Sequence, residues 1–216
     1  MIGRTEREGR MTAPINYEIL SAIDRAIKTV WLNNIQADWQ NDALLREDSL
    51  KCAFYYHLRR KLANLLRKNN LRIFSEYRFA ALNLKADLVI VKLHDNWKNA
   101  DFLADAVSGV IAVIELKYTG DASRRMEETI KGDVRKFKRY LQEGNIDCLY
   151  YLGVIYEAEC LRLNWMDKRA TNAWAGGRTA ELDAGYMDGR IKFEVHSYKD
   201  LSRNKIQHLE IKVMIG

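Results

Sequence analysis

The stretch "IAVIELKYTG", residues 111–120, holds the clearest strand signal in the chain. It begins as an unbroken apolar run, which is typical of a buried strand, and then places Glu115 and Lys117 two positions apart. Because side chains alternate across a strand, this acid and this base point to the same face of the sheet. Such a pair can form a structural ion pair, lie on an exposed rim, or bind a metal ion with a water beside it.

Segments on both sides of this stretch are rich in branched and aromatic residues, as strands are. The predicted strands are 72–82, 86–93, 109–118 and 148–157, with 207–215 as a candidate for a last one. The strand at 148–157 is apolar almost throughout, which indicates a central position. The segment 179–198 predicts a hairpin that turns at Asp188-Gly189, although Gly185 weakens its first arm.

Apolar residues at helical spacing predict four helices. They are 15–40, a segment from Asp48 or Ser49 to about Lys68, 121–144, and 158–174. The order of helices and strands predicts an α/β fold with a mixed central β-sheet flanked by helices. The step from 109 to 157 should be a parallel crossover, which is right-handed in nearly all proteins.

The chain of 216 residues suffices for one large domain. We predict a charged N-terminal extension over 1–14 and a single domain over 15–216, with a C-terminal helix and strands over 158–216. No apolar run approaches the ~20 residues that span a bilayer, and the charged start is not a signal peptide. Three cysteines without metal-like pairing indicate reduced thiols in a cytoplasmic protein.

The net charge of +6 permits nucleic-acid binding, and the distribution of charge is more informative. Between Ser49 and Ser75 there is no acid. The basic residues of that segment are Lys51, Arg59, Arg60, Lys61, Arg67, Lys68 and Arg72. They form either a solvated helix face or a surface that contacts phosphates.

The predicted helix 121–144 poses the same choice. Its basic residues include Arg135, Lys136 and Arg139. They contact a phosphodiester backbone, or they lie on an exposed face balanced by Glu127 and Glu128.

The E-x-K triplet alone is weak evidence, because it occurs again at Glu210 and Lys212. The context separates the two triplets. Asp87 is an acid at the edge of the preceding apolar strand, so pairing of strands 86–93 and 109–118 would bring it to Glu115. Glu210 has no comparable partner just upstream, and we interpret it as part of a solvated strand face.

This order of residues resembles the PD-(D/E)xK nuclease superfamily, to which many restriction endonucleases and junction resolvases belong. The resemblance covers about residues 47–156 and rests on Asp87, Glu115 and Lys117. The family often adds an acid on the helix before the sheet, which here is Glu47, with Asp48 as its rival. Ala86 stands where the family's motif has proline.

The resemblance implies a restriction endonuclease-like core and a metal-dependent endonuclease that hydrolyses DNA. Asp87, Glu115, Glu47 and the Leu116 carbonyl would bind Mg²⁺, for which Mn²⁺ can substitute. Lys117 would position the attacking water and stabilise the transition state. Without metal, the clustered carboxylates should repel one another and raise a carboxylate pKa. Duplex cutting would use two symmetry-related sites, which implies a homodimer.

Two alternatives stay open. The first is a protein of the same fold that binds nucleic acid or a partner without cutting. The second is an α/β protein in which the triplet is a coincidence, so that Asp87 and Glu115 lie far apart or are separately paired.

Overall fold

The computed structural model describes residues 17–120, 124–159 and 178–197. The predicted N-terminal extension, most of the predicted helix 158–174, the candidate strand 207–215, the second E-x-K triplet and Cys160 lie outside these residues.

The described chain contains a six-stranded mixed sheet whose spatial order follows the sequence. The strands are β1 (Leu71–Phe79), β2 (Leu84–Leu93), β3 (Val107–Thr119), β4 (Leu149–Glu159), β5 (Thr179–Met187) and β6 (Arg190–Ser197). Strands β3, β4 and β5 run parallel, and the other neighbours are antiparallel. This arrangement confirms the predicted mixed sheet, the central position of β4 and the parallel step that follows β3.

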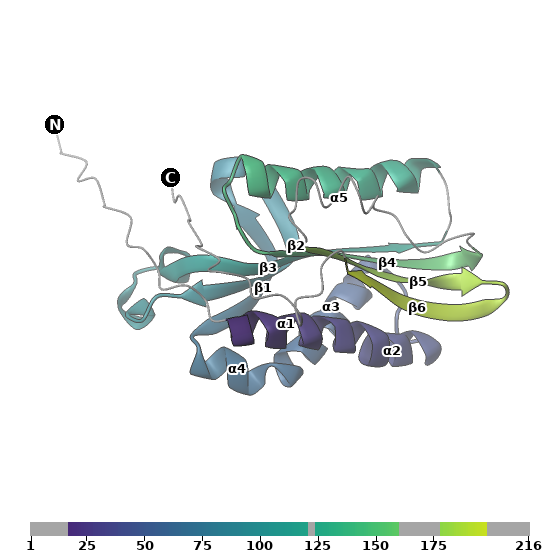
Figure 1. Ribbon diagram of the computed structural model, residues 1–216, viewed down its shortest axis with the longest axis horizontal. Helices are drawn as coiled ribbons and strands as arrows, with labels where there is room; N and C mark the ends of the chain where they lie inside the picture. The colour runs from purple at the N-terminus through teal and green to yellow at the C-terminus, as the bar shows by residue number, and fades with distance from the viewer. Residues whose placement is uncertain (1–16, 121–123, 160–177, 198–216) are drawn as a thin grey trace.

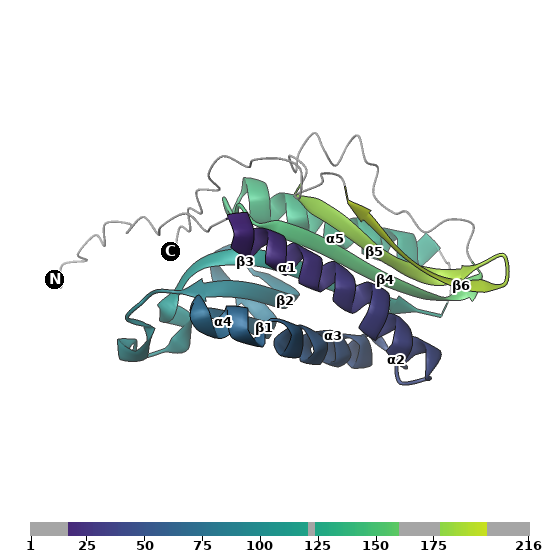
Figure 2. The same cartoon turned by 60° about the horizontal axis from the view of Figure 1, so that its bottom comes forward.

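Helices cover both faces of the sheet, as predicted (Figure 1). One face carries α1 (Tyr17–Thr29), a π-helix (Val30–Ile35), α2 (Gln36–Gln40), α3 (Glu47–Lys61) and α4 (Ala63–Lys68). Figure 2 shows α3 and α4 beside α1 and α2 on this face. The opposite face carries α5 (Arg124–Gln142). Short 3-10 helices lie at Ala80–Leu82, Trp97–Asn99 and Leu103–Ala106.

Each face of the sheet has its own apolar core. Trp31 and Phe54 are fully buried between the N-terminal helices and the sheet. Phe137 and Tyr140 from α5 are buried with residues of β2, β3 and β4 on the opposite face. Because β3 contributes residues to both cores, its backbone is held from both sides.

Several elements differ in extent or form from the sequence prediction. The helix 15–40 contains a π-helical turn within its described part, and the second helix begins at Glu47 and breaks at Leu62. The first strand ends at Phe79, because a 3-10 turn and the left-handed backbone of Asn83, with φ of 50°, turn the chain into β2. The helix predicted from 158 is wrong at its start, since β4 continues through Glu159.

The predicted hairpin is confirmed, and its first arm is complete. β5 and β6 pair up to Met187 and Arg190, which leaves a two-residue turn. Asp188 and Gly189 have φ of 52° and 68°, the left-handed backbone that two-residue turns between twisted strands require. No helix within the described ranges is long and apolar enough to cross a membrane.

Candidate functional site

The sheet brings Asp87 on β2 and Glu115 on β3 to the same end of two adjacent strands. Leu88 pairs with Ile114 in the antiparallel ladder, and the two acids are the next residues along each strand. Asp87 Oδ2 accepts the backbone N–H of Leu116 at 2.8 Å. Asp87, Glu115 and Lys117 are all buried, so strand pairing fixes three charged groups at the rim of the core.

Glu47 is the first residue of α3 and reaches the same place from the helical layer. Lys117 Nζ lies 3.3 Å from each of its carboxylate oxygens. The start of α3 is fixed by Ser49, whose hydroxyl accepts the backbone N–H of Leu45 and of Arg46 at 2.9 Å. The rival acid, Asp48, has a side chain that is 95% exposed. The helix acid that pairs with Lys117 is Glu47, whereas Asp48 lies at the cavity rim, 3.8 Å from Lys51 Nζ.

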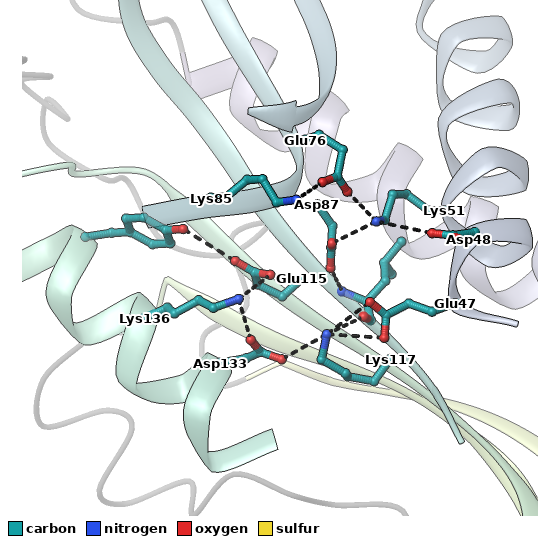
Figure 3. A network of polar contacts seen from close by, with 12 residues as sticks. Glu47, Asp48, Lys51, Glu76, Lys85, Asp87, Glu115, Lys117, Asp133 and Lys136 are labelled. Carbon is teal, nitrogen blue, oxygen red and sulfur yellow. Dashed lines mark hydrogen bonds and ion pairs between the residues drawn. The ribbon is translucent and has the colours of Figure 1, made fainter. Parts of the chain in front are cut away.

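Helix α5 closes the site from the opposite side with residues that sequence reasoning did not place there (Figure 3). Lys136 Nζ lies 3.2 Å from Glu115 Oε2 and 2.7 Å from Asp133 Oδ1. Lys117 Nζ lies 3.4 Å from the other oxygen of Asp133. The Tyr140 hydroxyl donates to Glu115 Oε1 at 3.5 Å.

A third lysine holds Asp87 from the side of α3. Lys51 Nζ lies 3.1 Å from Asp87 Oδ1 and also pairs with Glu76, which in turn pairs with Lys85 (Figure 3). These groups line a cavity of about 600 Å³ between α3 and the first two strands. The lining residues are Glu47, Asp48, Lys51, Cys52, Tyr55, Ser75, Glu76, Lys85, Asp87, Lys117 and Lys136.

Burial shifts the protonation of the site's acids. The pKa of Glu115 is raised to about 8 by burial first, then by Asp133 and Asp87, against the opposing effect of Lys136. Burial also raises the pKa of Glu47. The expected rise of a carboxylate pKa is thus confirmed, although loss of solvation outweighs the repulsion that was its predicted cause.

The lysines remain charged. Burial lowers the pKa of Lys51, Lys117 and Lys136, but the surrounding carboxylates outweigh it and the net pKa of each is raised. Three ammonium groups therefore compensate the acids.

The donor set fits a hard cation by its chemistry. Carboxylates and one backbone carbonyl are the oxygen ligands that Mg²⁺ takes, and there is no sulfur or imidazole to favour a softer ion. Asp133 Oδ2 is buried and accepts no hydrogen bond, and Lys117 Nζ lies 3.4 Å from it. Over the described residues, however, no three acidic, histidine or cysteine side chains already surround one point. Lysines lie between the acids, and the Leu116 carbonyl accepts Lys117 Nζ at 3.0 Å.

The residues predicted to contact nucleic acid fall into two groups. Arg59, Arg60 and Lys61 are exposed at the end of α3, and Arg135 is exposed on α5. Lys136 instead belongs to the candidate site. Arg139 pairs with Glu143 at 2.9 Å and donates to the Leu82 carbonyl at 3.1 Å, so it joins α5 to the 3-10 turn after β1.

Sequence signals for the missed residues exist. Asp133 falls on the apolar stripe of α5, three residues after Ile130 and four before Phe137. An acid on a buried helical stripe is unusual and needs a partner. Lys51 follows Glu47 by four residues, which places both on one face of α3.

Comparisons of the chain with protein-family models, with curated proteins and with solved structures found no significant match.

Proposed function

We propose that the protein is a metal-dependent nuclease with a restriction endonuclease-like core that hydrolyses phosphodiester bonds in DNA. One observation carries the proposal: Asp87, Glu115 and Lys117, selected by their pattern in the sequence, meet Glu47 beside a charged cavity. The antiparallel strands that carry the acids, followed by α5 and a parallel strand, match the order that the superfamily resemblance implies.

The chain's own residues have separable roles in this proposal. Asp87, Glu115, Glu47 and the Leu116 carbonyl would hold Mg²⁺, which supplies an activated water and neutralises charge developing on the phosphate. The hydrogen bond from Leu116 N–H to Asp87 fixes the orientation of this carboxylate.

Lys117 is protonated and directed by Glu47 and Asp133, so it can donate to the attacking water or to a phosphate oxygen. Lys51 and Lys136 bring further positive charge to the cavity that the phosphodiester enters.

A second function is favoured by a different feature of the same site. The three lysines already compensate the acids without any bound ion. A protein of the same fold that binds nucleic acid without cutting it would have the same balance of charge. Cleavage and binding therefore have to be measured separately.

The deciding experiment incubates the protein with supercoiled, linear, branched and single-stranded DNA in Mg²⁺ or Mn²⁺. Lys117→Ala should abolish cutting and leave DNA binding nearly intact, because one lysine among many contributes little to phosphate affinity. Asp87→Asn and Glu115→Gln should abolish cutting and weaken Mg²⁺ binding, since each removes a charged oxygen ligand.

The second triplet supplies the matched control. Glu210→Gln with Lys212→Ala should change neither cutting nor Mg²⁺ binding. Loss of activity in this control with retention in Lys117→Ala would identify the wrong triplet. If no DNA form is cut with either ion, the non-cutting binder is the better conclusion.

A further inference from the structure

Two tyrosine–arginine pairs extend along α3 away from the cavity. Arg59 Nη1 donates to the Tyr55 hydroxyl at 3.1 Å, and its guanidinium carbon lies 5.4 Å from the ring centroid. Arg60 and Tyr56 repeat this arrangement at 3.0 Å and 5.5 Å. We call these four residues the tyrosine–arginine face.

The tyrosine–arginine face meets the candidate site through Tyr55, and the Tyr56–Arg60 pair lies about 100° further round α3. Tyr55 itself lines the cavity, together with Lys51 one helical turn before it. Arg59 follows Lys51 by eight residues, which is about 12 Å of helix. A ligand that occupies the cavity and leaves it along α3 therefore passes Tyr55 before it reaches the arginines.

The charges of this face are not used within the described parts of the chain. No carboxylate of the described residues lies within ion-pair distance of Arg59 or Arg60. Each guanidinium donates one hydrogen bond to the hydroxyl of its tyrosine. The Tyr56 side chain is 53% exposed, which is unusual for a large ring. The sequence has no acid between Ser49 and Ser75, although Lys51 in this segment pairs with Asp87 and Glu76 from the first two strands.

Aromatic rings interleaved with cations along a groove are the means by which proteins bind single strands of nucleic acid. Bases stack on the rings and phosphates contact the cations, without the need to read a sequence. A duplex instead presents stacked, paired bases to the protein, so exposed tyrosines have little to bind there. The chemistry of the tyrosine–arginine face fits an unpaired strand better than a duplex.

The cavity is large enough for one unit of such a strand. About 600 Å³ lies within the range of sites for small molecules. One unpaired nucleotide can therefore occupy the cavity while its neighbours lie along α3.

We propose that the tyrosine–arginine face guides one unpaired strand of nucleic acid into the cavity. The assignment of this strand as a substrate rests on the proposed nuclease function, whereas its binding does not. The preferred partner of the site is thus a single-stranded region or end.

The test measures binding by fluorescence anisotropy in EDTA, so that cleavage plays no part. The probes are oligo(dU), oligo(U) and a blunt DNA hairpin of similar charge. We expect an unpaired oligonucleotide to bind at least about tenfold more tightly than the hairpin. The tighter of oligo(dU) and oligo(U) identifies the sugar. Equal or tighter binding of the hairpin would overturn the proposal.

Two substitutions with matched controls test the face itself. Tyr56→Ala should weaken binding of the unpaired strand by about fivefold or more, as expected for the loss of one base–aromatic stack. Arg59→Ala with Arg60→Ala should reduce the salt dependence of binding. The exposed residues Phe102 and Arg190 provide the controls Phe102→Ala and Arg190→Ala, which should leave affinity unchanged.

The outcomes separate the two proposals. If Tyr56→Ala has native circular dichroism and binds the unpaired strand as tightly as the unaltered protein, the proposed role of the tyrosine–arginine face is wrong. Mg²⁺-dependent cutting of duplex DNA would still support the nuclease. Tight binding of an unpaired strand without any cleavage keeps the face and removes the nuclease.

Discussion

Glu115 is the most deeply buried acid of the candidate site, at 1% exposure, and its ion-pair partner is Lys136. At pH 9, above the pKa of Glu115, Lys136→Met should destabilise the fold by about 2 kcal/mol, because it leaves a buried carboxylate without its cation. Adding Glu115→Gln should recover most of that loss, since the group left behind is then neutral. Urea unfolding of the two single variants and the double variant measures the coupling.

Lys131 gives the matched control for this cycle. It lies on the same helix and pairs with Glu127 and Glu128, but all three side chains are more than half exposed. Lys131→Met should therefore change the free energy of unfolding by less than about 0.5 kcal/mol. If Lys136→Met and Lys131→Met changed the free energy of unfolding equally, the buried ion pair would contribute no more to stability than the exposed one.

A second buried acid lies away from the candidate site, on β5. Asp183 has no exposed surface, and neither carboxylate oxygen accepts a hydrogen bond. His196 Nε2 lies 3.8 Å away, and Glu194 is nearer to that histidine, at 3.2 Å. Burial, then Glu181 and then Glu194, raise the pKa of Asp183 well above its ordinary 3.8.

The raised pKa predicts how stability changes with pH. The contribution of Asp183 is fully present below its unfolded pKa near 3.8 and is lost as the pH rises through the folded pKa. Asp183→Asn should flatten the decline and stabilise the protein by about 1 kcal/mol or more at pH 8. Urea unfolding from pH 4.5 to 9 measures this, and parallel curves would contradict it.

At the scale of the elements, β4 supports the site from behind through a glycine. Gly153 pairs with Leu116 across the parallel ladder, and an added Cβ would lie 2.7 Å from Leu116 Cδ2 and 3.4 Å from the Trp31 ring. Gly153→Ala should therefore destabilise the protein by about 1–3 kcal/mol. Because the Leu116 backbone contacts both Asp87 and Lys117, any cleavage activity should also fall.

A glycine-to-alanine substitution in α5 should instead stabilise the protein. The nearest atom to a Cβ added at Gly132 is Arg135 Nη2, at 3.9 Å, so space is available. Gly132→Ala should stabilise the protein by about 1 kcal/mol, because alanine restricts the unfolded chain and favours the helix. Thermal unfolding of both alanine variants compares them directly. Destabilisation by Gly132→Ala would contradict the packing described for α5.

Strand elements and their charged residues were predictable because strand alternation is a local rule. This rule placed Glu115 and Lys117 on one face of the sheet. The position of Asp87 at the end of the preceding strand then predicted that Asp87 lies next to Glu115. The π-helical turn was not predictable, since a helix with six residues in a wider turn has the same apolar pattern as a continuous one. Its place depends on tertiary contacts, such as the bond from Trp31 Nε1 to the Asp183 carbonyl.

The contribution of α5 to the site was not predictable from pattern alone. Which helical charges turn inward depends on how the helix lies over the sheet, and that is a long-range property. Lys136 and Arg135 are neighbours in sequence, yet one contacts Glu115 and the other is exposed. The same limit explains why Lys51 was assigned to a basic surface rather than to the acid on β2.

At the scale of the whole molecule, the two proposals differ in the number of copies required. The predicted homodimer follows from duplex cutting, whereas a single copy suffices for an unpaired strand. We expect activity per chain on unpaired DNA to stay constant on dilution, with the mass followed by light scattering. Activity that falls together with the mass would show that the dimer is needed. Reductant should not change the mass, since the predicted dimer needs no disulfide; Cys148 is buried, whereas Cys52 is exposed at the cavity.

The sheet has a further consequence for how the protein is made, because each of the six described strands pairs with its neighbours in sequence. As the chain leaves the ribosome, β1, β2 and β3 can form a hairpin ladder before any later strand exists, since such pairings are local. At that stage Glu115 has no lysine from α5 beside it. The docking of α5 brings Lys136 to this acid. Assembly of the charged centre therefore finishes with a helix that is synthesised after β1, β2 and β3.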